Sequence, residues 1–317
     1  MNVKKPENTT DYSRVNLPFS AELAEELLDN YGSPLYVYDG DKLAATIAEI
    51  TAAIPHPKTQ FQFASVTNGN ISLLKIFNRH GWGLHANTPG DAFLGLKAGF
   101  DPATIVFTGS NLSSQEFEML LNWGIATYNL DSLQQLQEFG EIFQTVKPPL
   151  SPRIGFRLNY PEITGESRIG IRPQEFPDAV KIAASCGLKI TGLHFYRGTG
   201  TNATPAFTQS IQPILAIAQN LPDWHYLDFG GGFGYPYQKG NVAFDWRMFG
   251  QEITAALRNL NRDIELIIEP GRAAIAGCGT LLTKVISVKR QDQKSVGKIN
   301  MISPTHFPSN QKNWRRG

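Results

Sequence analysis

The sequence predicts an α/β protein built as an eightfold β/α (TIM) barrel. Two observations lead to this fold class. Strand-like and helix-like runs alternate along most of the chain, and eight such units fill about 230 residues, close to the roughly 250 typical of these barrels. A repeated β/α unit implies a parallel sheet with helices outside it. An open doubly wound sheet is the alternative, but the dinucleotide fingerprint G-x-G-x-x-G is absent after the first strand.

The candidate strands follow one another at regular spacing. In chain order they are PLYVYD at 34–39, FQFASV at 61–66, GWGLHA at 81–86, TIVFTG at 104–109, GIATYNL at 124–130, RIGFRLN at 153–159, KITGLHFY at 189–196, WHYLDFGGG at 224–232 and IELIIEPGR at 264–272. FQFASV, for example, alternates bulky apolar residues with small or polar ones, as a strand does. The short first strand is set aside, and the other eight are expected to form the barrel.

Helical patterns lie between these strands. In SLQQLQEFGEIF the apolar residues Leu133, Leu136, Phe139 and Phe143 recur at spacings of three and four, which places them on one face of an amphipathic helix. This pattern is typical of a helix that packs on a sheet.

Composition limits the classes of function. The chain has 317 residues, 41% of them hydrophobic, which is enough for a sizeable core. The net charge of +1 gives no overall field toward nucleic acid or an anionic membrane. Cys186 and Cys278 lie far apart without metal-ligand spacing, so neither a disulfide framework nor a metal site is expected. No signal peptide or membrane span is evident, which predicts a cytoplasmic protein.

The ends of the last two strands carry the strongest site signal, because a barrel assembles its active site at the carboxyl ends of its strands. The glycines 230–232 form a loop whose backbone N–H groups a phosphate could approach. Glu269, Gly271 and Arg272 follow the next strand. Together they suggest a ligand with a phosphate at one end and a basic ring nitrogen at the other, as in pyridoxal phosphate. The alternatives are a plain glycine turn and a structural Glu–Arg pair at the barrel rim.

Seven motifs in order resemble one known family. They are PLYVYD, the FxxxxNxN strand end, GSNLS after IVFTG, NLDS after GIATY, GLHFYRGTG, YLDFGGGFG and IIEPGR. The chain is similar, from about residue 30 to 290, to the diaminopimelate and ornithine decarboxylases, whose barrel is of the alanine-racemase type (fold type III). PLYVYD and the HF before RGTG are closer to the diaminopimelate branch. The resemblance implies a pyridoxal-phosphate-dependent lyase of amino-acid metabolism and lysine biosynthesis.

The resemblance also implies roles for individual residues. The glycine loop (Gly230, Gly231, Gly232) and Arg272 would hold the cofactor phosphate, and Gly271 lies in the same motif. Thr199, the hydroxyl residue after the strand-six glycine, would also reach the phosphate. Glu269 would pair with the pyridine nitrogen and keep it protonated, so that the ring can accept electrons from the breaking C–C bond. Asn68 aligns with an asparagine of the family's strand end.

The same alignment predicts that the nucleophile is missing. The family's lysine, which bonds to the cofactor aldehyde, corresponds here to Val66, and valine has no amine. Lys75 is expected to point away from the barrel, and Lys189 begins its strand at the opposite end from the site. Any bound cofactor is therefore expected to be held noncovalently.

Further departures fall in the same pocket. Tyr196 stands where the family stacks a histidine on the cofactor ring, and a tyrosine can still stack. His85 replaces an acid near the end of strand two, where it is either a structural residue or an acid–base group. Arg157 and Arg197 are further candidates, and Arg197 adds a cation near the phosphate or points to solvent.

The predicted domains are an N-terminal arm (1–33), a cofactor-binding barrel (34–277) and a remnant of a second β domain with an irregular tail (278–317). TLLTKVISVKR is expected to be a lone strand with an unpaired edge, left by truncation or divergence. In the family that domain completes the active site of the partner subunit in a dimer.

Three hypotheses stay open. The chain is a family member with little or no turnover of its own (a pseudoenzyme), an active decarboxylase with noncovalent cofactor, or a binding or regulatory protein. The expected ligand is a small amino acid or phosphate compound. A homodimer, or a heterodimer with an intact homologue, is the expected assembly, with neither nucleic acid nor membrane as a partner.

Overall fold

The computed structural model describes residues 18–148, 150–165, 167–198, 200, 202–238, 240–291 and 294–299. The chain divides into two compact units, one formed by Met1–Tyr38 with Gly279–Gly317 and the other by Asp39–Cys278. Each unit is described by itself.

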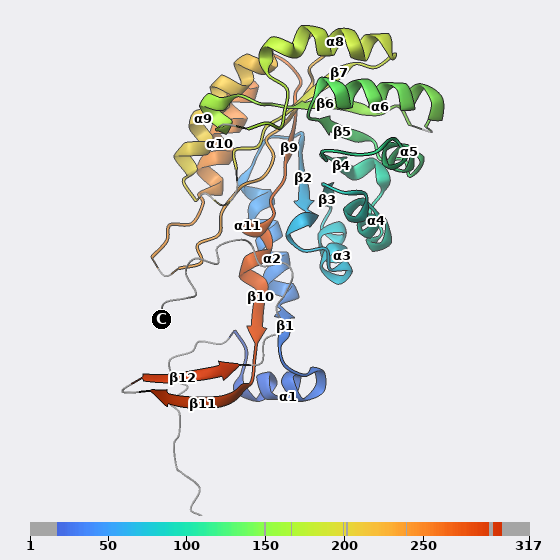
Figure 1. Cartoon of the computed structure of the whole chain (residues 1–317). Coiled ribbons are helices and arrows are strands. Elements are labelled where there is room, and N and C mark those ends of the chain that lie inside the picture. Colours follow the sequence, from blue (N-terminus) through green and yellow to red (C-terminus); the bar gives the residue numbers. More distant parts are fainter. Residues whose placement is uncertain are drawn as a thin grey trace, which may run out of the picture. The chain divides into compact units, whose positions relative to one another are not determined.

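The unit Asp39–Cys278 is a closed barrel of eight parallel strands surrounded by helices (Figure 1). The strands are β2 (Thr59–Ala64), β3 (Gly83–Ala86), β4 (Ile105–Phe107), β5 (Thr127–Leu130), β6 (Arg153–Arg157), β7 (Ile190–His194), β8 (Tyr226–Asp228) and β9 (Glu265–Ile268). Each pairs with the next in the sequence, and β9 closes the barrel against β2 through the pair Thr59 and Leu266. The predicted fold class is confirmed.

Helices connect successive strands, and several of these helices are capped by side chains at their N-terminal ends. The α-helices of the barrel unit are α2 (Gly40–Ala53), α3 (Ile71–Arg79), α4 (Pro89–Ala98), α5 (Ser114–Asn122), α6 (Leu133–Val146), α7 (Pro161–Thr164), α8 (Phe176–Ser185), α9 (Thr204–Ala218), α10 (Trp246–Arg258) and α11 (Arg272–Ile275). In α4, Thr88 and Asp91 form a reciprocal capping box, which satisfies backbone N–H groups that have no intrahelical partner. In α6, Leu136 and Phe139 of the predicted apolar face are buried.

Aromatic side chains fill the layer between strands and helices. Phe63 of β2 stacks on Phe77 of α3, with ring centroids 3.9 Å apart. Tyr128 of β5 contacts Phe139 of α6 at 4.8 Å. The alternation of β2 that the sequence shows therefore places its phenylalanines toward the helices, because successive strand residues face opposite sides.

The barrel interior is filled by Tyr226, which is fully buried and packs with Val106 and Ile267. A Cβ on Gly192 would lie 1.8 Å from Cζ of this ring, so β7 needs glycine there. The phenol hydroxyl donates to Oδ1 of Asn129 at 3.0 Å. Tyr226 thus forms a packed floor, since the inside of such a barrel is a core rather than a pore.

The other unit contains helix α1 (Ala21–Tyr31) and two antiparallel strand pairs. Strand β1 (Leu35–Tyr38) pairs with β10 (Gly279–Leu282), and β11 (Val285–Gln291) pairs with β12 (Lys294–Ile299). The prediction of a lone, unpaired strand in this region is wrong. The sequence KSVGKI of β12 was missed because a glycine and two lysines interrupt its apolar pattern.

Within the described part of the chain, no helix has the length and apolar character needed to span a membrane.

Candidate active site

The candidate site lies at the carboxyl ends of the barrel strands, where parallel pairing brings residues distant in sequence together. His194 and Asp228 are the last residues of β7 and β8, and Glu269 directly follows β9. His85 lies one residue before the end of β3. The single-turn 3₁₀ helix η2 (Ser65–Thr67) follows β2.

Val66 lies on η2 with 63% of its surface exposed. Its neighbours fix the loop: the Ser65 hydroxyl donates to the backbone oxygen of His85 at 2.9 Å, and Oδ1 of Asn68 accepts from the backbone N–H of Asn70 at 3.0 Å. A Cβ on Gly271 would lie 2.4 Å from Oγ1 of Thr67. The Val66 loop therefore lies directly against the motif that carries Glu269 and Arg272.

None of the eight barrel strands, all of which lie within the described residues, ends in a lysine. Lys75 is exposed on α3, on the side away from the buried Leu73, Leu74 and Phe77. Lys189 precedes β7 and forms an ion pair with Asp223 at 3.0 Å. Both positions agree with what the sequence predicts for these two lysines.

Two glycine loops and one arginine meet above β7 and β8. The N–H of Gly200 donates to the backbone oxygen of Gly232 at 2.9 Å. A Cβ on Gly232 would lie 2.2 Å from the oxygen of Gly198, and one on Gly200 would lie 2.4 Å from Nη2 of Arg272. Gly200 and Gly232 also have φ of +81° and +97°, which L side chains rarely adopt. The result is a backbone-lined cradle beside a guanidinium group. Thr199 lies outside the described residues.

Arg157 and Tyr196 are brought together at the end of β6 and the start of the loop after β7. The guanidinium carbon of Arg157 lies 5.4 Å from the ring centroid of Tyr196, within the range of a cation–π contact. Arg197 follows on the same loop and is half-buried. Arg157 is thereby placed against a predicted site residue.

A buried cluster of four ionisable groups lies at the same end of the barrel. Nε2 of His85 is 3.4 Å from Oε1 of Glu269, and Nε2 of His194 is 3.5 Å from Oε2 of the same carboxyl group. The two imidazole rings are nearly parallel, with centroids 6.5 Å apart. Asp228 accepts from the N–H of Gly230 at 3.0 Å and from Nδ2 of Asn129 at 2.8 Å.

Sequence reasoning missed His194 and Asp228, although both stood in quoted motifs, GLHFYRGTG and YLDFGGGFG. The available signal was their position in the chain. His194 lies two residues before Tyr196 and Asp228 two residues before Gly230, and strand residues two apart face the same side of the sheet. Asn129, which holds Asp228, carried no comparable signal because its partner lies three strands away.

Burial dominates the electrostatics of this cluster. It raises the pKa of Glu269 to about 8 and raises the pKa of Asp228 well above its usual range, with the neighbouring Glu269 charge acting in the same direction. It lowers the pKa of His85 to about 3 and that of His194 to about 4. At neutral pH the imidazoles are therefore uncharged, and most Glu269 carboxyl groups retain their proton, because a buried charge is costly.

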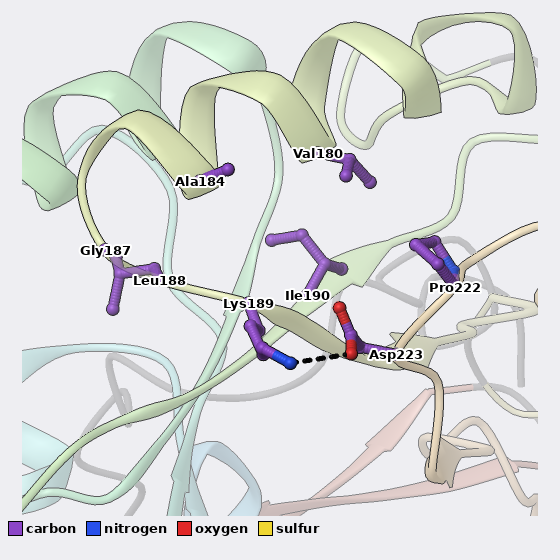
Figure 2. A pocket seen from close by; sticks show the side chains of 8 residues that line it. All are labelled: Val180, Ala184, Gly187, Leu188, Lys189, Ile190, Pro222 and Asp223. Carbon is purple, nitrogen blue, oxygen red and sulfur yellow. Dashed lines mark hydrogen bonds and ion pairs between the residues drawn. The ribbon is translucent and has the colours of Figure 1, made fainter.

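A separate cavity of about 320 Å³ lies at the other end of β7, lined in part by Val180, Leu188, Lys189 and Asp223 (Figure 2). Figure 2 shows the Lys189–Asp223 ion pair at its edge, and both side chains are partly open to solvent. The residues of the buried cluster are not among those that line it. This cavity is therefore distinct from the candidate active site.

Comparisons with known proteins agree with this arrangement. Residues 41–276 match the family described as pyridoxal-dependent decarboxylase, pyridoxal binding domain. The chain is 31% identical over 297 residues to the diaminopimelate decarboxylase of Methanothermobacter thermautotrophicus, covering 86% of this chain and 68% of that one.

Solved structures give the same result. The diaminopimelate decarboxylase of Helicobacter pylori complexed with L-lysine matches with a TM-score of 0.79 and 28% identity, over 87% of this chain and 72% of that one. The lysine/ornithine decarboxylase of Vibrio vulnificus complexed with cadaverine matches with a TM-score of 0.76 and 19% identity, over 88% of this chain and 74% of that one, which supports the fold alone. The family match, the relative and the fold together establish that this chain belongs to the pyridoxal-dependent decarboxylases of the diaminopimelate and ornithine type.

Proposed function

We propose that this chain binds pyridoxal 5′-phosphate noncovalently at the carboxyl end of the barrel and has little or no decarboxylase turnover of its own. The observation that carries the proposal is the combination of an intact glycine–arginine cradle with Val66 at the place of the family's lysine.

The cradle supports phosphate binding. Gly200 and Gly232 leave no side chain between their loops, and Arg272 brings a permanent positive charge to that place. Backbone N–H groups and a guanidinium are the usual donors to a phosphate. Gly230 and Gly231 lie on the same loop, and any side chain there would collide with backbone: a Cβ would lie 2.1 Å from the oxygen of Phe195 or 2.6 Å from that of Glu269.

The carboxyl group of Glu269 supports the assignment of the ring end. It is 2% exposed, and its Oε1 has no hydrogen-bond partner among the described residues. A buried unsatisfied oxygen is costly, so a ligand with a ring nitrogen that shares a proton with it would relieve that cost. When bound, the cofactor would act as an electron sink for the bond that breaks. Tyr196, with Arg157 over its ring, is the residue proposed to lie against the cofactor ring.

The absent amine supports weak or absent turnover. A lysine at position 66 would bond to the cofactor aldehyde and be displaced by the substrate amine, whereas the valine side chain offers no nucleophile. Lys75 and Lys189 lie too far from the cluster to replace it, one on the outer helix layer and one at the opposite strand end.

The proposed small-molecule ligand beside the cofactor is an amino acid. The diaminopimelate decarboxylase of Helicobacter pylori is complexed with L-lysine in its solved structure. In this proposal a substrate amine reaches the cofactor aldehyde directly, because no protein amine occupies it.

The test is a titration of the purified full chain with pyridoxal phosphate, followed by visible absorption, then by borohydride reduction and intact-mass measurement. We expect saturable binding without a mass adduct. A borohydride-stable adduct would show that another amine replaces the lysine. Absence of binding would remove the cofactor site and favour a binding or regulatory role. Turnover of diaminopimelate, ornithine or lysine with added cofactor would favour an active enzyme.

A further inference from the structure

We propose that the cofactor site of this chain does not select for an aldehyde, and that it binds pyridoxal, pyridoxine and pyridoxamine 5′-phosphates with similar affinities. The inference rests on the proposed function, in which the glycine–arginine cradle holds the phosphate and Glu269 meets the ring nitrogen. It adds the chemical class of the ligand, which is a phosphorylated pyridine with any small polar group on its 4′ carbon.

The side chains proposed to hold the ligand lie at its phosphate and at its ring nitrogen. A Cβ on Gly200 would lie 2.4 Å from Nη2 of Arg272, and Oε1 of the buried Glu269 has no hydrogen-bond partner among the described residues. All three vitamers carry the same phosphate and the same ring nitrogen. They differ only at the 4′ carbon, which bears an aldehyde, an alcohol or an aminomethyl group. Arg272 and Glu269 therefore supply affinity for the shared groups and little discrimination between the vitamers.

The residue at position 66 is the one that would distinguish the 4′ groups. A lysine there favours the aldehyde, because only an aldehyde can form an imine with its amine. Val66 has neither an amine nor any hydrogen-bonding group, and 63% of its surface is exposed. A site strongly rejects an analogue only where it holds a partner for the group that the analogue lacks. With valine at this position, the aldehyde has no such partner.

The loop around Val66 is also uncharged. Residues 65–70 read SVTNGN and include no acidic or basic side chain. The loop is held by Ser65, whose hydroxyl donates to the backbone oxygen of His85 at 2.9 Å, while Val66 stays open to solvent. A polar group beside an exposed position keeps much of its water, so its binding costs little desolvation. This holds for an alcohol as well as for an aldehyde.

Two electrostatic effects set the expected order of affinities. The ammonium of pyridoxamine phosphate brings a positive charge into a site that already holds Arg157 beside Tyr196 and the half-buried Arg197, and like charges repel. Pyridoxine phosphate has no charge at its 4′ carbon. Because an alcohol withdraws fewer electrons than an aldehyde, its ring nitrogen is more basic and forms a stronger charge-assisted hydrogen bond with Glu269. We therefore expect pyridoxine phosphate to bind at least as tightly as pyridoxal phosphate.

The experiment is a calorimetric titration of the purified full chain with each of the three vitamers and with inorganic phosphate. We expect the dissociation constants of pyridoxal and pyridoxine phosphates to agree within about threefold and that of pyridoxamine phosphate to lie within about tenfold of them. Inorganic phosphate should bind much more weakly, because it lacks the ring.

Substitution at residue 66 supplies the matched comparison. Val66→Lys should prefer pyridoxal over pyridoxine phosphate by at least about tenfold, since only the aldehyde gains a covalent bond. Val66→Met, which has no amine, should show no such preference. Circular dichroism checks that both variants are folded, and the wild-type comparison stands without them.

The outcomes separate this inference from the cofactor proposal. Tight binding of pyridoxal phosphate with pyridoxine phosphate more than about tenfold weaker would overturn the inference and leave the cofactor site standing. Failure of all three vitamers to bind would remove the cofactor site, and the inference with it. Inorganic phosphate that binds as tightly as the vitamers would mean that the ring is not recognised. A folded Val66→Lys protein without a preference would mean that residue 66 does not face the 4′ carbon, and either result would also overturn the inference.

Discussion

Arg272 and Gly200 approach each other so closely that a Cβ on Gly200 would lie 2.4 Å from Nη2 of the arginine. The guanidinium therefore occupies the space that only a glycine leaves open. A charge held in this way is pre-organised, which lowers the entropy lost when it binds an anion.

Replacing Arg272 with alanine should weaken binding of pyridoxal phosphate by about 1.5–3 kcal/mol, because hydrogen bonds to charged groups are worth about this much. A fluorescence or absorbance titration measures the change. Arg258→Ala, on the exposed end of α10, is the control and should leave affinity unchanged. Equal affinity of the Arg272 variant and wild type would remove this residue from the site.

Replacing Val66 with lysine should restore a covalent bond to the cofactor aldehyde. The bond would appear as an absorption band at longer wavelength than that of the free cofactor, and borohydride should trap the adduct at residue 66. Val66→Met has a similar length without an amine and should give neither signal. The lysine variant should also gain more stability from added cofactor than wild type, since a ligand that binds only the folded state stabilises it. A lysine variant with neither band nor adduct would mean that the site differs from the family's by more than one residue.

Replacing Gly192 with alanine should destabilise the barrel by roughly 1–3 kcal/mol, as overpacking of a core does. The new methyl would meet the Tyr226 ring at 1.8 Å, where the ring fills the barrel floor. Urea unfolding measures the loss. Gly90→Ala, near the start of α4, has no comparable neighbour and should be neutral or slightly stabilising. If both variants unfold at the same urea concentration, Tyr226 is not tightly packed.

The contribution of Glu269 to the free energy of unfolding should decrease as pH rises from about 4.5 to 8. Its pKa is raised to about 8 in the folded state by burial, so in this window the folded chain holds a proton that the unfolded chain has lost. The slope from this group is at most about 1.4 kcal/mol per pH unit. Glu269→Gln should reduce the slope, measured by urea unfolding from about pH 5 to 8. The same slope in the variant would assign the effect to other groups.

His85 should act in the opposite direction at lower pH. Burial lowers its pKa to about 3, so between about pH 6.5 and 3 the unfolded chain binds more protons and stability falls as pH falls. His85→Asn should lessen this loss of stability in acid. Unfolding curves between about pH 4 and 6.5 test the prediction, and a variant that loses stability as steeply as wild type would contradict it.

The sequence was sufficient for the barrel because each strand is a short local pattern and the eight repeat in order. It also placed Glu269 and Arg272 at one strand end, since motif and strand are contiguous in the chain. It was not sufficient for the cluster. Whether His194 and Asp228 lie near Glu269 depends on register and on which strand residues face inward, and both are set by packing across the barrel. Strand β12 was missed for a different reason, because a glycine and two lysines interrupt the apolar pattern of its sequence KSVGKI.

The closure of the barrel has a consequence for how the chain acquires its site. Thr59 of β2 pairs with Leu266 of β9, so the contact that shuts the ring joins segments near opposite ends of the barrel sequence. Contacts between residues so far apart in sequence form slowly, because closing the long loop between them costs conformational entropy before the contacts can stabilise the fold. Val66 lies two residues after the end of β2, and Glu269 directly follows β9. During synthesis the two halves of the pocket cannot meet until β9 has emerged, and ligand capture would then report that the ring has closed.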